Sequence, residues 1–324
     1  MIKTPVCDLM GIEHPIALGG MGSVYSPPLV AAVSNAGGLG AMGCHNLSPE
    51  RIREGAAAIR ENTNKPFALN FLIFSAEEEG FAAALAEHPP HMAFAWPRPD
   101  QDIAQFIARA HEVGCKVTFM AGGVPEAVRA AETGADVIVA QGTEGGGHVS
   151  WMTSMTLVPM VVDAVAPIPV LAAGGFSDGR GLAAALALGA DGILLGTRFL
   201  ASEESPLHAN FKQAIVDSDG HDTLLTEIPD IAQATVWPGA MSRAKRNRFI
   251  ERWSGREWAL RQHQAEALAD ILAARTAGDV DEAPLSMGQD AGLIKDVLPA
   301  GEIVRRIAAD AEAILAKRLP EMLV

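Results

Sequence analysis

The chain is poor in cysteine and in aromatic residues, and these shortages narrow the classes of protein to which it can belong. Cys7, Cys44 and Cys115 are its three cysteines, and they lack the paired spacing of a disulfide framework or of a zinc site. This usage is typical of a reducing compartment, so we expect a cytoplasmic protein. Aromatic residues make up 5% of the chain and hydrophobic residues 49%, so we expect a large aliphatic core.

The chain also lacks an uninterrupted apolar run and an excess of positive charge. Its most apolar window, residues 155–173, is broken by Asp163 and three prolines, and the N-terminus has no apolar signal region, so we expect no membrane span and a soluble protein. The formal net charge of −14 argues against nucleic acid as a partner, because phosphate binding needs a positive field. Small molecules are the expected partners, and no feature predicts an oligomeric state.

Short apolar runs bounded by glycine alternate with segments whose apolar residues recur every three or four positions. Strands are expected at 14–18, 39–42, 67–73, 91–95, 116–119, 137–140, 169–172 and 192–195. Helices are expected at 27–35, from Ser48, and at 76–87, 103–110, 125–132, 157–165, 178–188 and 206–216. Gly134 and Gly189 precede two of the strands, where glycine can end a helix in the left-handed conformation.

Eight strand-then-helix units over roughly 200–250 residues predict an α/β fold of the (β/α)8 TIM barrel type. The chain lacks a Gly-x-Gly-x-x-Gly motif after the first strand, which counts against a dinucleotide-binding Rossmann fold. After residue 217 the pattern loosens: 243–275 is predicted mostly helical, 277–291 a loop, and the apolar spacing from Ile303 a closing helix. We expect residues 1–217 plus 301–324 to form the barrel and its closing helix, and residues 218–300 a C-terminal helical insertion or cap over the barrel mouth.

The segment Ala140-Gln-Gly-Thr-Glu-Gly-Gly-Gly-His148 follows the sixth predicted strand. Four glycines let the backbone approach a flat or anionic ligand, because no Cβ stands in the way. His148 adds a side chain that can titrate near neutral pH. The segment therefore predicts a cofactor site with an acid–base residue beside it; the alternative is a flexible turn with an incidental surface histidine.

Glycines also follow the last two predicted strands, in Ala172-Ala-Gly-Gly-Phe176 and Gly196-Thr-Arg-Phe199. In TIM barrels a phosphate commonly binds at this place, on freed backbone N–H groups and a helix N-terminus. The segment Gly19-Gly-Met-Gly22 and the amide of Asn70 lie at other strand ends, where a planar ring could rest on the backbone at Met21. The histidines have no metal-ligand spacing, so no metal is expected.

Five motifs occur in a characteristic order: Gly19-Gly-Met-Gly22, Asn35-Ala-Gly-Gly-Leu-Gly40, Ala140-Gln-Gly-Thr-Glu-Gly-Gly-Gly-His148, Ala172-Ala-Gly-Gly-Phe-Ser-Asp-Gly-Arg180 and Gly196-Thr-Arg-Phe199. Together they resemble the nitronate monooxygenase (formerly 2-nitropropane dioxygenase) family of FMN-dependent TIM-barrel oxidoreductases. The resemblance covers residues 11–205 and, more weakly, the tail around Gly288-Gln289. It is specific for the superfamily and less so for the substrate, because flavin-type enoyl-ACP reductases and some NADH:quinone reductases share it.

The resemblance implies non-covalently bound FMN, with its phosphate on the last two glycine turns and its ring near the first strand end. The implied cofactor-binding residues are Gly20, Met21, Gly22, Asn70, Gln141, Gly146, Gly147, Ala173, Gly174, Gly175, Gly196, Thr197 and Gln289. His148 matches the family's active-site histidine, as the base or as a group that positions the substrate anion. Met120 departs from the pattern, because some relatives carry lysine there.

The activity implied by the resemblance is oxidation of alkyl nitronates or nitroalkanes with O2 to a carbonyl compound and nitrite. One alternative is an NAD(P)H-dependent FMN reductase on the same scaffold, acting on an enoyl thioester or a quinone; the basic residues between Arg243 and Arg256 would then dock an acidic carrier. A second alternative is a flavin-free phosphate-binding barrel lyase or isomerase, for which Glu144 is the evident catalytic candidate.

Overall fold

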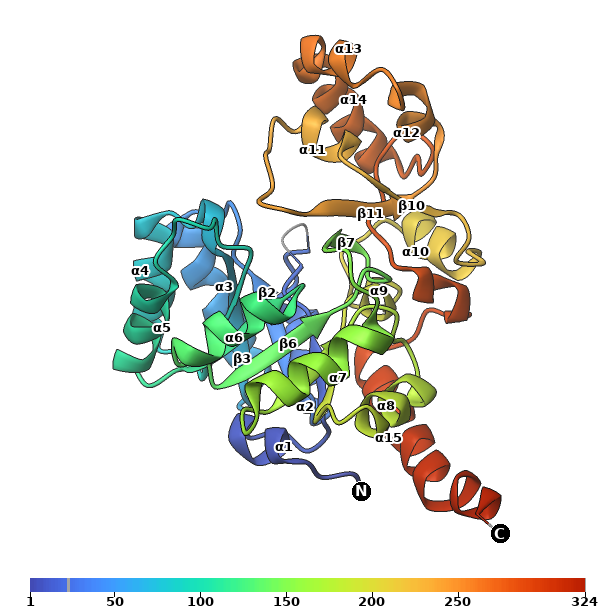
Figure 1. The fold of residues 1–324 in the computed structure, drawn as a ribbon. Coiled ribbons are helices and arrows are strands. Elements are labelled where there is room, and N and C mark those ends of the chain that lie inside the picture. The colour runs from blue at the N-terminus through green and yellow to red at the C-terminus, as the bar shows by residue number, and fades with distance from the viewer. Residues whose placement is uncertain (22–23, 324) are drawn as a thin grey trace.

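A computed structural model describes residues 1–21 and 24–323 of the chain (Figure 1). Eight parallel strands stand in the order β1-β9-β8-β6-β5-β4-β3-β2, and a parallel bridge between Ala17 and Leu39 joins the two outer strands. The strands are β1 (Ile16–Leu18), β2 (Gly40–Gly43), β3 (Phe67–Leu72), β4 (His91–Ala95), β5 (Lys116–Ala121), β6 (Val137–Gln141), β8 (Val170–Ala173) and β9 (Gly192–Leu195). The fold is the predicted TIM barrel.

Helices follow the barrel strands and cover the outside of the barrel, as the sequence predicts. They are α2 (Pro27–Asn35), α3 (Pro49–Asn62), α4 (Glu78–Ala86), α5 (Ile103–Glu112), α6 (Val124–Glu132), α7 (Ser154–Val165), α8 (Gly179–Ala187), α9 (Thr197–Leu200) and α10 (Ala209–Val216); α1 (Pro5–Met10) precedes the first strand. Ser48 caps α3, and its hydroxyl accepts a hydrogen bond from the backbone N–H of Arg51. Gly134 and Gly189 have φ of +106° and +91°, the left-handed conformation expected at these helix ends.

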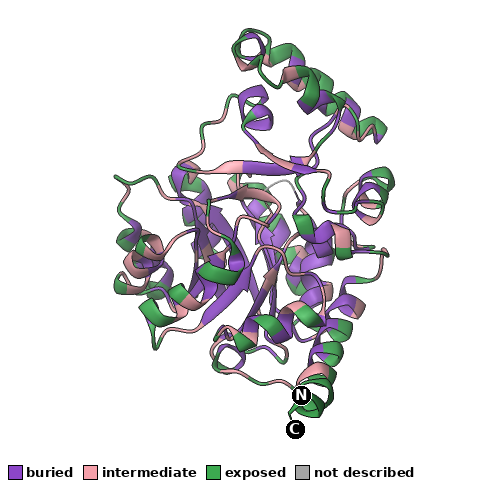
Figure 2. Ribbon diagram, turned by 45° about the vertical axis from the view of Figure 1, so that its right-hand side comes forward, coloured by how far each residue is buried: buried purple, intermediate pink, exposed green. Residues whose placement is uncertain are grey.

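Burial follows the layers of the barrel, with the strands almost wholly buried and the outer helix faces exposed (Figure 2). Parallel strands are covered on both faces, which explains why they appear in the sequence as continuous apolar runs rather than alternating ones. The core is mainly aliphatic, as expected, and the three cysteines are buried within it. Burial raises the pKa of Cys44 to about 12 and that of Cys115 to about 11, so both thiols stay protonated at neutral pH.

A second, three-stranded antiparallel sheet stands at one end of the barrel. It contains β10 (Thr223–Thr226), β11 (Met241–Lys245) and β7 (Gly147–Val149), in the order β10-β11-β7. The helices α11 (Ile228–Ala232), α12 (Arg248–Trp253), α13 (Glu257–Gln262) and α14 (Gln264–Ala277) pack beyond it and stand above the barrel in Figure 1. The prediction that 243–275 is mostly helical is wrong at its start, because Arg243–Lys245 belongs to a strand that pairs with two distant segments.

The chain returns to the barrel through an irregular segment that contains η2 (Gln289–Leu293), and α15 (Ala300–Ala313) then packs against α8 and α2. The buried side of α15 carries the predicted apolar face: Ile303, Val304, Ile307 and Ala311. The short segments η3 (Ile314–Arg318) and η4 (Pro320–Met322) end the described chain, and η1 (Ile73–Ser75) follows β3. Within the described ranges, no helix has the length and apolarity to cross a membrane.

Candidate functional site

His148 lies on β7, at the end of the glycine loop that follows β6. Its Nε2 is 2.9 Å from Oδ1 of Asp230, a residue of α11 that is 82 positions away in the chain. Trp237, from the loop between α11 and β11, stacks on the imidazole with ring centroids 3.3 Å apart and an angle of 11° between the planes. The His148 side chain is 16% exposed, so its ring is fixed by two residues of the 218–300 region and remains partly accessible.

An aromatic cluster extends from Trp237 to the ends of β3 and β4. The ring of Phe74 lies 4.8 Å from Trp237 and that of Trp96 lies 6.1 Å from it, measured between centroids. Trp96 has φ of +55°, an uncommon conformation for a bulky residue and one that often marks a functional site. Apolar contacts within the cluster therefore join the loop after α11 to the ends of β3 and β4.

His45, which follows β2, is a second histidine near this mouth. Its ring lies 6.2 Å from Phe74, and its Nδ1 is 3.0 Å from the hydroxyl of Ser75. Burial lowers the pKa of His45, and the charge of His148 lowers it further. At neutral pH His45 is therefore an uncharged hydrogen-bonding group close to His148.

The glycine loop needs its glycines because other backbone segments approach them closely. A Cβ at Gly146 would lie 2.5 Å from the backbone N of Gly288, and one at Gly142 would lie 2.0 Å from the hydroxyl of Ser154. Gly147 differs, because its φ is +73° and, among the described residues other than its chain neighbours, no atom lies within 4 Å of the position that a Cβ would take. The loop is thus packed against the 287–288 segment on one side and faces open space at its end.

The turn after β8 packs on the same loop. Gly174 and Gly175 have φ of +87° and +84°, and a Cβ at Gly174 would lie 2.5 Å from the carbonyl oxygen of Gly142. Ala173 ends β8, is buried, and accepts a hydrogen bond from the N–H of Gly142 through its carbonyl. This turn and the glycine loop therefore form one continuous backbone surface.

The turn after β9 lies beside them. Gly196 precedes α9, and among the described residues a Cβ there would meet only the Met21 sulfur, 3.7 Å away, so the turn leaves room beside its backbone. The Thr197 hydroxyl accepts a hydrogen bond of 2.9 Å from the N–H of Gly288. Gln289, predicted to reach the cofactor, donates from its backbone N–H to the carbonyl of Glu144, and its side chain is exposed.

Asp290 follows this segment and is deeply buried. Burial raises its pKa from 3.8 to about 7, although Arg198 and the Thr197 hydroxyl act in the opposite direction. A carboxyl group that can hold its proton near neutral pH thus lies directly behind the glycine turns.

The residues predicted for the cofactor ring lie after β1 and near the carboxyl end of β3. Gly20 faces Asn70 so closely that a Cβ on Gly20 would lie 2.2 Å from the Asn70 Cβ. The Asn70 amide donates to the carbonyl of Ala93 at 3.2 Å, so it is anchored to β4. Met21 is half-buried, and Gly22 lies outside the described residues. The structure thus places Gly20 and Asn70 together, and because β1 pairs with β9 they lie on the side of the turn after β9.

Gln141 ends β6, between these two groups of residues. Its Oε1 atom is buried and has no hydrogen-bond partner in the described chain. An unpaired buried amide oxygen is costly and calls for a donor that the protein itself does not provide.

Glu144 has a structural role in the loop. Its carboxylate accepts hydrogen bonds of 2.9 and 3.0 Å from the N–H of Ser154 and one of 3.1 Å from its hydroxyl, at the first turn of α7. Within residues 1–21 and 24–323, no group of three or more potential ligand side chains could hold a metal ion.

Two residues of this site were not predicted from the sequence. Asp230 and Trp237 both contact His148, and the sequence predicts neither contact. Neither has a local sequence signal, because each reaches His148 only through the fold of the 218–300 region.

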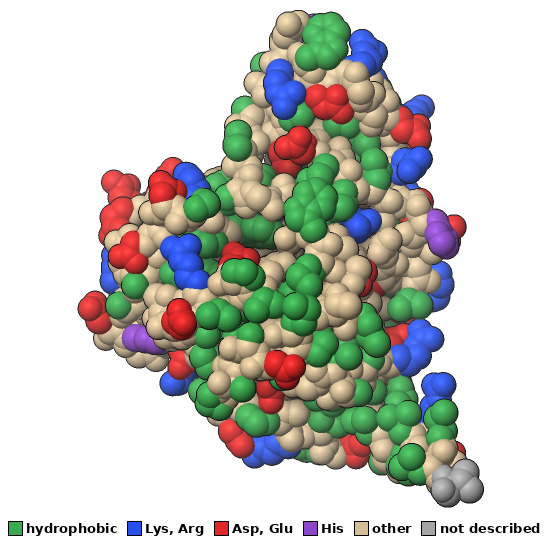
Figure 3. Space-filling model, in the orientation of Figure 1, with side chains coloured by type: hydrophobic (Ala, Val, Ile, Leu, Met, Phe, Trp, Pro, Cys, Tyr) green, Lys and Arg blue, Asp and Glu red, His purple; other side chains and the backbone are tan. Residues whose placement is uncertain are grey.

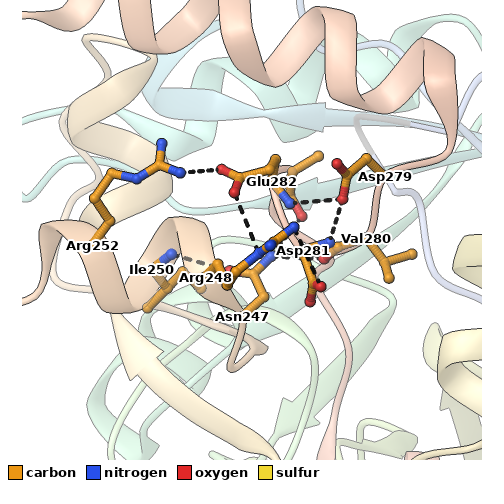
Figure 4. A network of polar contacts seen from close by, with 9 residues as sticks. Asn247, Arg248, Ile250, Arg252, Asp279, Val280, Asp281 and Glu282 are labelled. Atoms are coloured by element: carbon orange, nitrogen blue, oxygen red, sulfur yellow. Dashed lines mark hydrogen bonds and ion pairs between the residues drawn. The ribbon is translucent and has the colours of Figure 1, made fainter.

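The basic residues between Arg243 and Arg256 do not form an open cationic face. Arg248 and Arg252 pair with carboxylates of Asp281 and Glu282, as Figure 4 shows. Arg243 is buried, and its Nε donates to the Thr143 carbonyl at 2.8 Å. Lys245 pairs with Asp222, so three of the six basic side chains in this stretch are paired with carboxylates.

Comparison with known proteins places this site in a family. In sequence the chain is 32% identical to (3aS,4S,5R,7aS)-5-hydroxy-7a-methyl-1-oxo-octahydro-1H-indene-4-carboxyl-CoA dehydrogenase of Mycobacterium tuberculosis, over 96% of each chain. It is 30% identical to a probable nitronate monooxygenase of Staphylococcus aureus, over 94% of this chain and 96% of the relative.

Solved structures give the same picture. FabK from Thermotoga maritima superposes with a TM-score of 0.88 at 34% identity, over 99% of this chain and 100% of FabK. Nitroalkane oxidase from Streptomyces ansochromogenes superposes with a TM-score of 0.82 at 29% identity, over 96% and 99%. The family model for nitronate monooxygenase matches residues 3–96 and 82–310. The chain therefore belongs to the nitronate monooxygenase family and is an oxidoreductase.

Proposed function

We propose that this protein oxidises alkyl nitronates and nitroalkanes with O2, using bound FMN. The observation that carries the proposal is the placement of His148, fixed by Asp230 and Trp237 at the end of a glycine loop. Two nitronate anions and one O2 give two carbonyl compounds and two nitrite ions, which balances atoms and charge. The partners are thus a small nitro compound and O2.

The residues at the barrel mouth fit FMN. The unpaired Oε1 of Gln141 offers an acceptor to a ring N–H, and the open backbone at Gly196 and Gly147 leaves room that a side chain would fill. We assign the phosphate to the turns at Gly174–Gly175 and Gly196–Thr197. The remaining residues of the proposed set are Gly20, Met21, Gly22, Asn70, Gly146, Ala173 and Gln289. The flavin, when bound, supplies the redox chemistry that side chains lack.

His148 serves as the base for nitroalkanes. It takes the proton from the carbon that bears the nitro group, and the C–H electron pair moves onto the nitro oxygens. A positioned base contributes about 10²- to 10⁴-fold. With a nitronate no proton has to be removed, so His148 is then not needed as a base.

We propose further that residues 218–300 act as a cap over the barrel mouth, with residues 1–217 and 301–324 forming the barrel and closing helix. Two contacts support this division of the chain: Asp230 and Trp237 of the 218–300 region both contact His148. Figure 1 shows β10 and β11 above the barrel beside β7. Hydrophobic side chains lie on the surface between cap and barrel in Figure 3, as suits a mouth for organic substrates.

A second candidate is a flavin-dependent oxidoreductase of thioesters. One similar protein favours it, the carboxyl-CoA dehydrogenase of Mycobacterium tuberculosis, whose name denotes a CoA thioester. Arg248 and Arg252 are paired with acidic side chains, which argues against a binding surface for an acidic carrier protein. For this second candidate function, a free thioester is therefore the better substrate. The flavin-free lyase is disfavoured, because Glu144 is already bonded to Ser154.

The test is a direct comparison of substrates. Purified protein is scanned for flavin absorbance, and O2 uptake is then measured with an alkyl nitronate and with 2-nitropropane. NAD(P)H oxidation is followed in parallel with a quinone and with an enoyl thioester. Nitrite formed at about two per O2 supports the proposal, whereas NAD(P)H oxidation without nitrite formation contradicts it. A colourless protein that cannot bind FMN would contradict both flavin readings.

A further inference from the structure

The cap carboxylate of Asp230 lies in contact with the ring of His148. Its Oδ1 atom is 2.9 Å from Nε2, and the two side chains are 9% and 16% exposed. Asp230 comes from α11, a helix of the cap, and His148 from the active-site loop of the barrel. A hydrogen bond of ordinary length that is shielded from water constrains where the imidazole proton resides.

An ionised carboxylate only accepts hydrogen bonds, so the contact requires the proton on Nε2. The neutral ring then has its lone pair on Nδ1. No hydrogen bond to Nδ1 occurs in the part of the chain that the structure describes. The geometry therefore leaves Nδ1 as the nitrogen that can take a proton.

We propose that Asp230 is the positioning residue of the site, which fixes the Nε2–H tautomer of His148 and makes Nδ1 the basic atom. Asp230 touches neither substrate nor flavin in this account; it acts through His148. The assignment of Nδ1 as the base rests on the proposed function, whereas the tautomer itself can be measured without any turnover.

Two further contacts support a positioning role. Trp237 covers one face of the imidazole, with the two ring centroids 3.3 Å apart. This contact keeps the ring from rotating away from the Asp230 carboxylate. The backbone of His148 is also held, because residues 147–149 pair with 241–243 in the antiparallel ladder with register Ser242↔His148. Ring and backbone are thus both fixed by the cap, which leaves the carboxylate to select the tautomer.

The first experiment reads the tautomer by NMR. The flavin-loaded protein, labelled with ¹⁵N-histidine, gives long-range ¹H–¹⁵N correlations in which Nδ1 and Nε2 are distinguishable, and His148→Gln identifies the His148 signals among those of the nine histidines. We expect the neutral ring protonated on Nε2. A ring protonated on Nδ1 in the native protein would overturn the proposal, whether or not nitronates are substrates.

The second experiment changes the carboxylate. In Asp230→Asn the amide NH2 can donate to Nε2, which moves the proton to Nδ1 and removes the base. We expect the Nδ1–H pattern and a kcat with 2-nitropropane lower by about 10²- to 10⁴-fold, with a smaller change in KM. Turnover of a preformed nitronate should fall much less, because no proton is abstracted.

The matched control is Glu227→Gln, which removes an exposed carboxylate three residues before Asp230 and next to the same helix. We expect native tautomer and native kcat in this variant. An unchanged tautomer and an unchanged kcat in Asp230→Asn would refute the proposal. If the native protein oxidises no nitro compound, the proposed function fails, and the NMR result alone decides the role of Asp230.

Discussion

Replacing Gly174 by alanine should destabilise the protein through two separable effects. Its φ of +87° lies in the left-handed region, which costs a non-glycine residue about 1–2 kcal/mol. The new Cβ would also lie 2.5 Å from the carbonyl oxygen of Gly142, and relieving such a clash costs about 1–3 kcal/mol more. The expected loss in the free energy of unfolding is therefore about 2–5 kcal/mol.

The size of the chain converts this loss into a shift in melting temperature. With an unfolding entropy of about 2.1 cal/mol/K per residue, a chain of 324 residues should lose about 3–7 °C. Thermal unfolding, followed by circular dichroism with and without excess FMN, measures this shift. The shift should persist without FMN, because both effects come from the polypeptide.

Gly147→Ala provides the control, because φ is +73° but no atom of the described chain beyond the neighbouring residues lies within 4 Å of the new Cβ. This variant carries only the conformational cost of about 1–2 kcal/mol, so its melting temperature should fall by about 1.5–3 °C. Equal shifts in the two variants would refute the idea that the β8 turn is pressed against the glycine loop. No shift in either would refute the left-handed conformations themselves.

Two other substitutions test groups next to the site. Burial raises the pKa of Asp290 to about 7 in the folded protein. Between about pH 4 and 7 the folded protein therefore holds a proton that the unfolded chain has released. The free energy of unfolding should fall as the pH rises through this range. Asp290→Asn should flatten this dependence in melting curves between pH 5 and 8, and a native slope in the variant would contradict the assignment. Glu144→Gln should weaken the first turn of α7 and cost about 1 kcal/mol in thermal unfolding while nitronate turnover persists. Complete loss of turnover with normal stability would instead make Glu144 catalytic.

The barrel could be predicted from the sequence because its signals are local. Each strand is a short apolar run, each helix has apolar residues three or four apart, and glycines such as Gly134 and Gly189 mark the boundaries with φ values that the structure confirms. Predicted and observed bounds coincide for α2, β4 and β9 and differ by one to three residues at the ends of other elements, where fraying and capping decide the limit.

The cap could be predicted only in outline, because its structure depends on pairing across long stretches of chain. Residues 241–245 form a strand only beside 223–226 and 147–149, and their sequence, Met-Ser-Arg-Ala-Lys, has neither the apolar alternation nor the β-branched residues of a typical strand. Arg243 can be buried there because Thr143, a hundred residues away, offers its carbonyl. Asp230 escaped prediction for the same reason, since only the folded cap brings it to His148.

The small antiparallel sheet has a consequence for how substrates can enter. Its ladder joins Met241, Ser242 and Arg243 to Val149, His148 and Gly147, so backbone hydrogen bonds connect the end of the glycine loop to the 218–300 region. Moving the 218–300 region away from the barrel would break the pairing of β11 with β7 and cost several hydrogen bonds. A substrate path that leaves this ladder intact must therefore avoid the edge formed by β7 and β11.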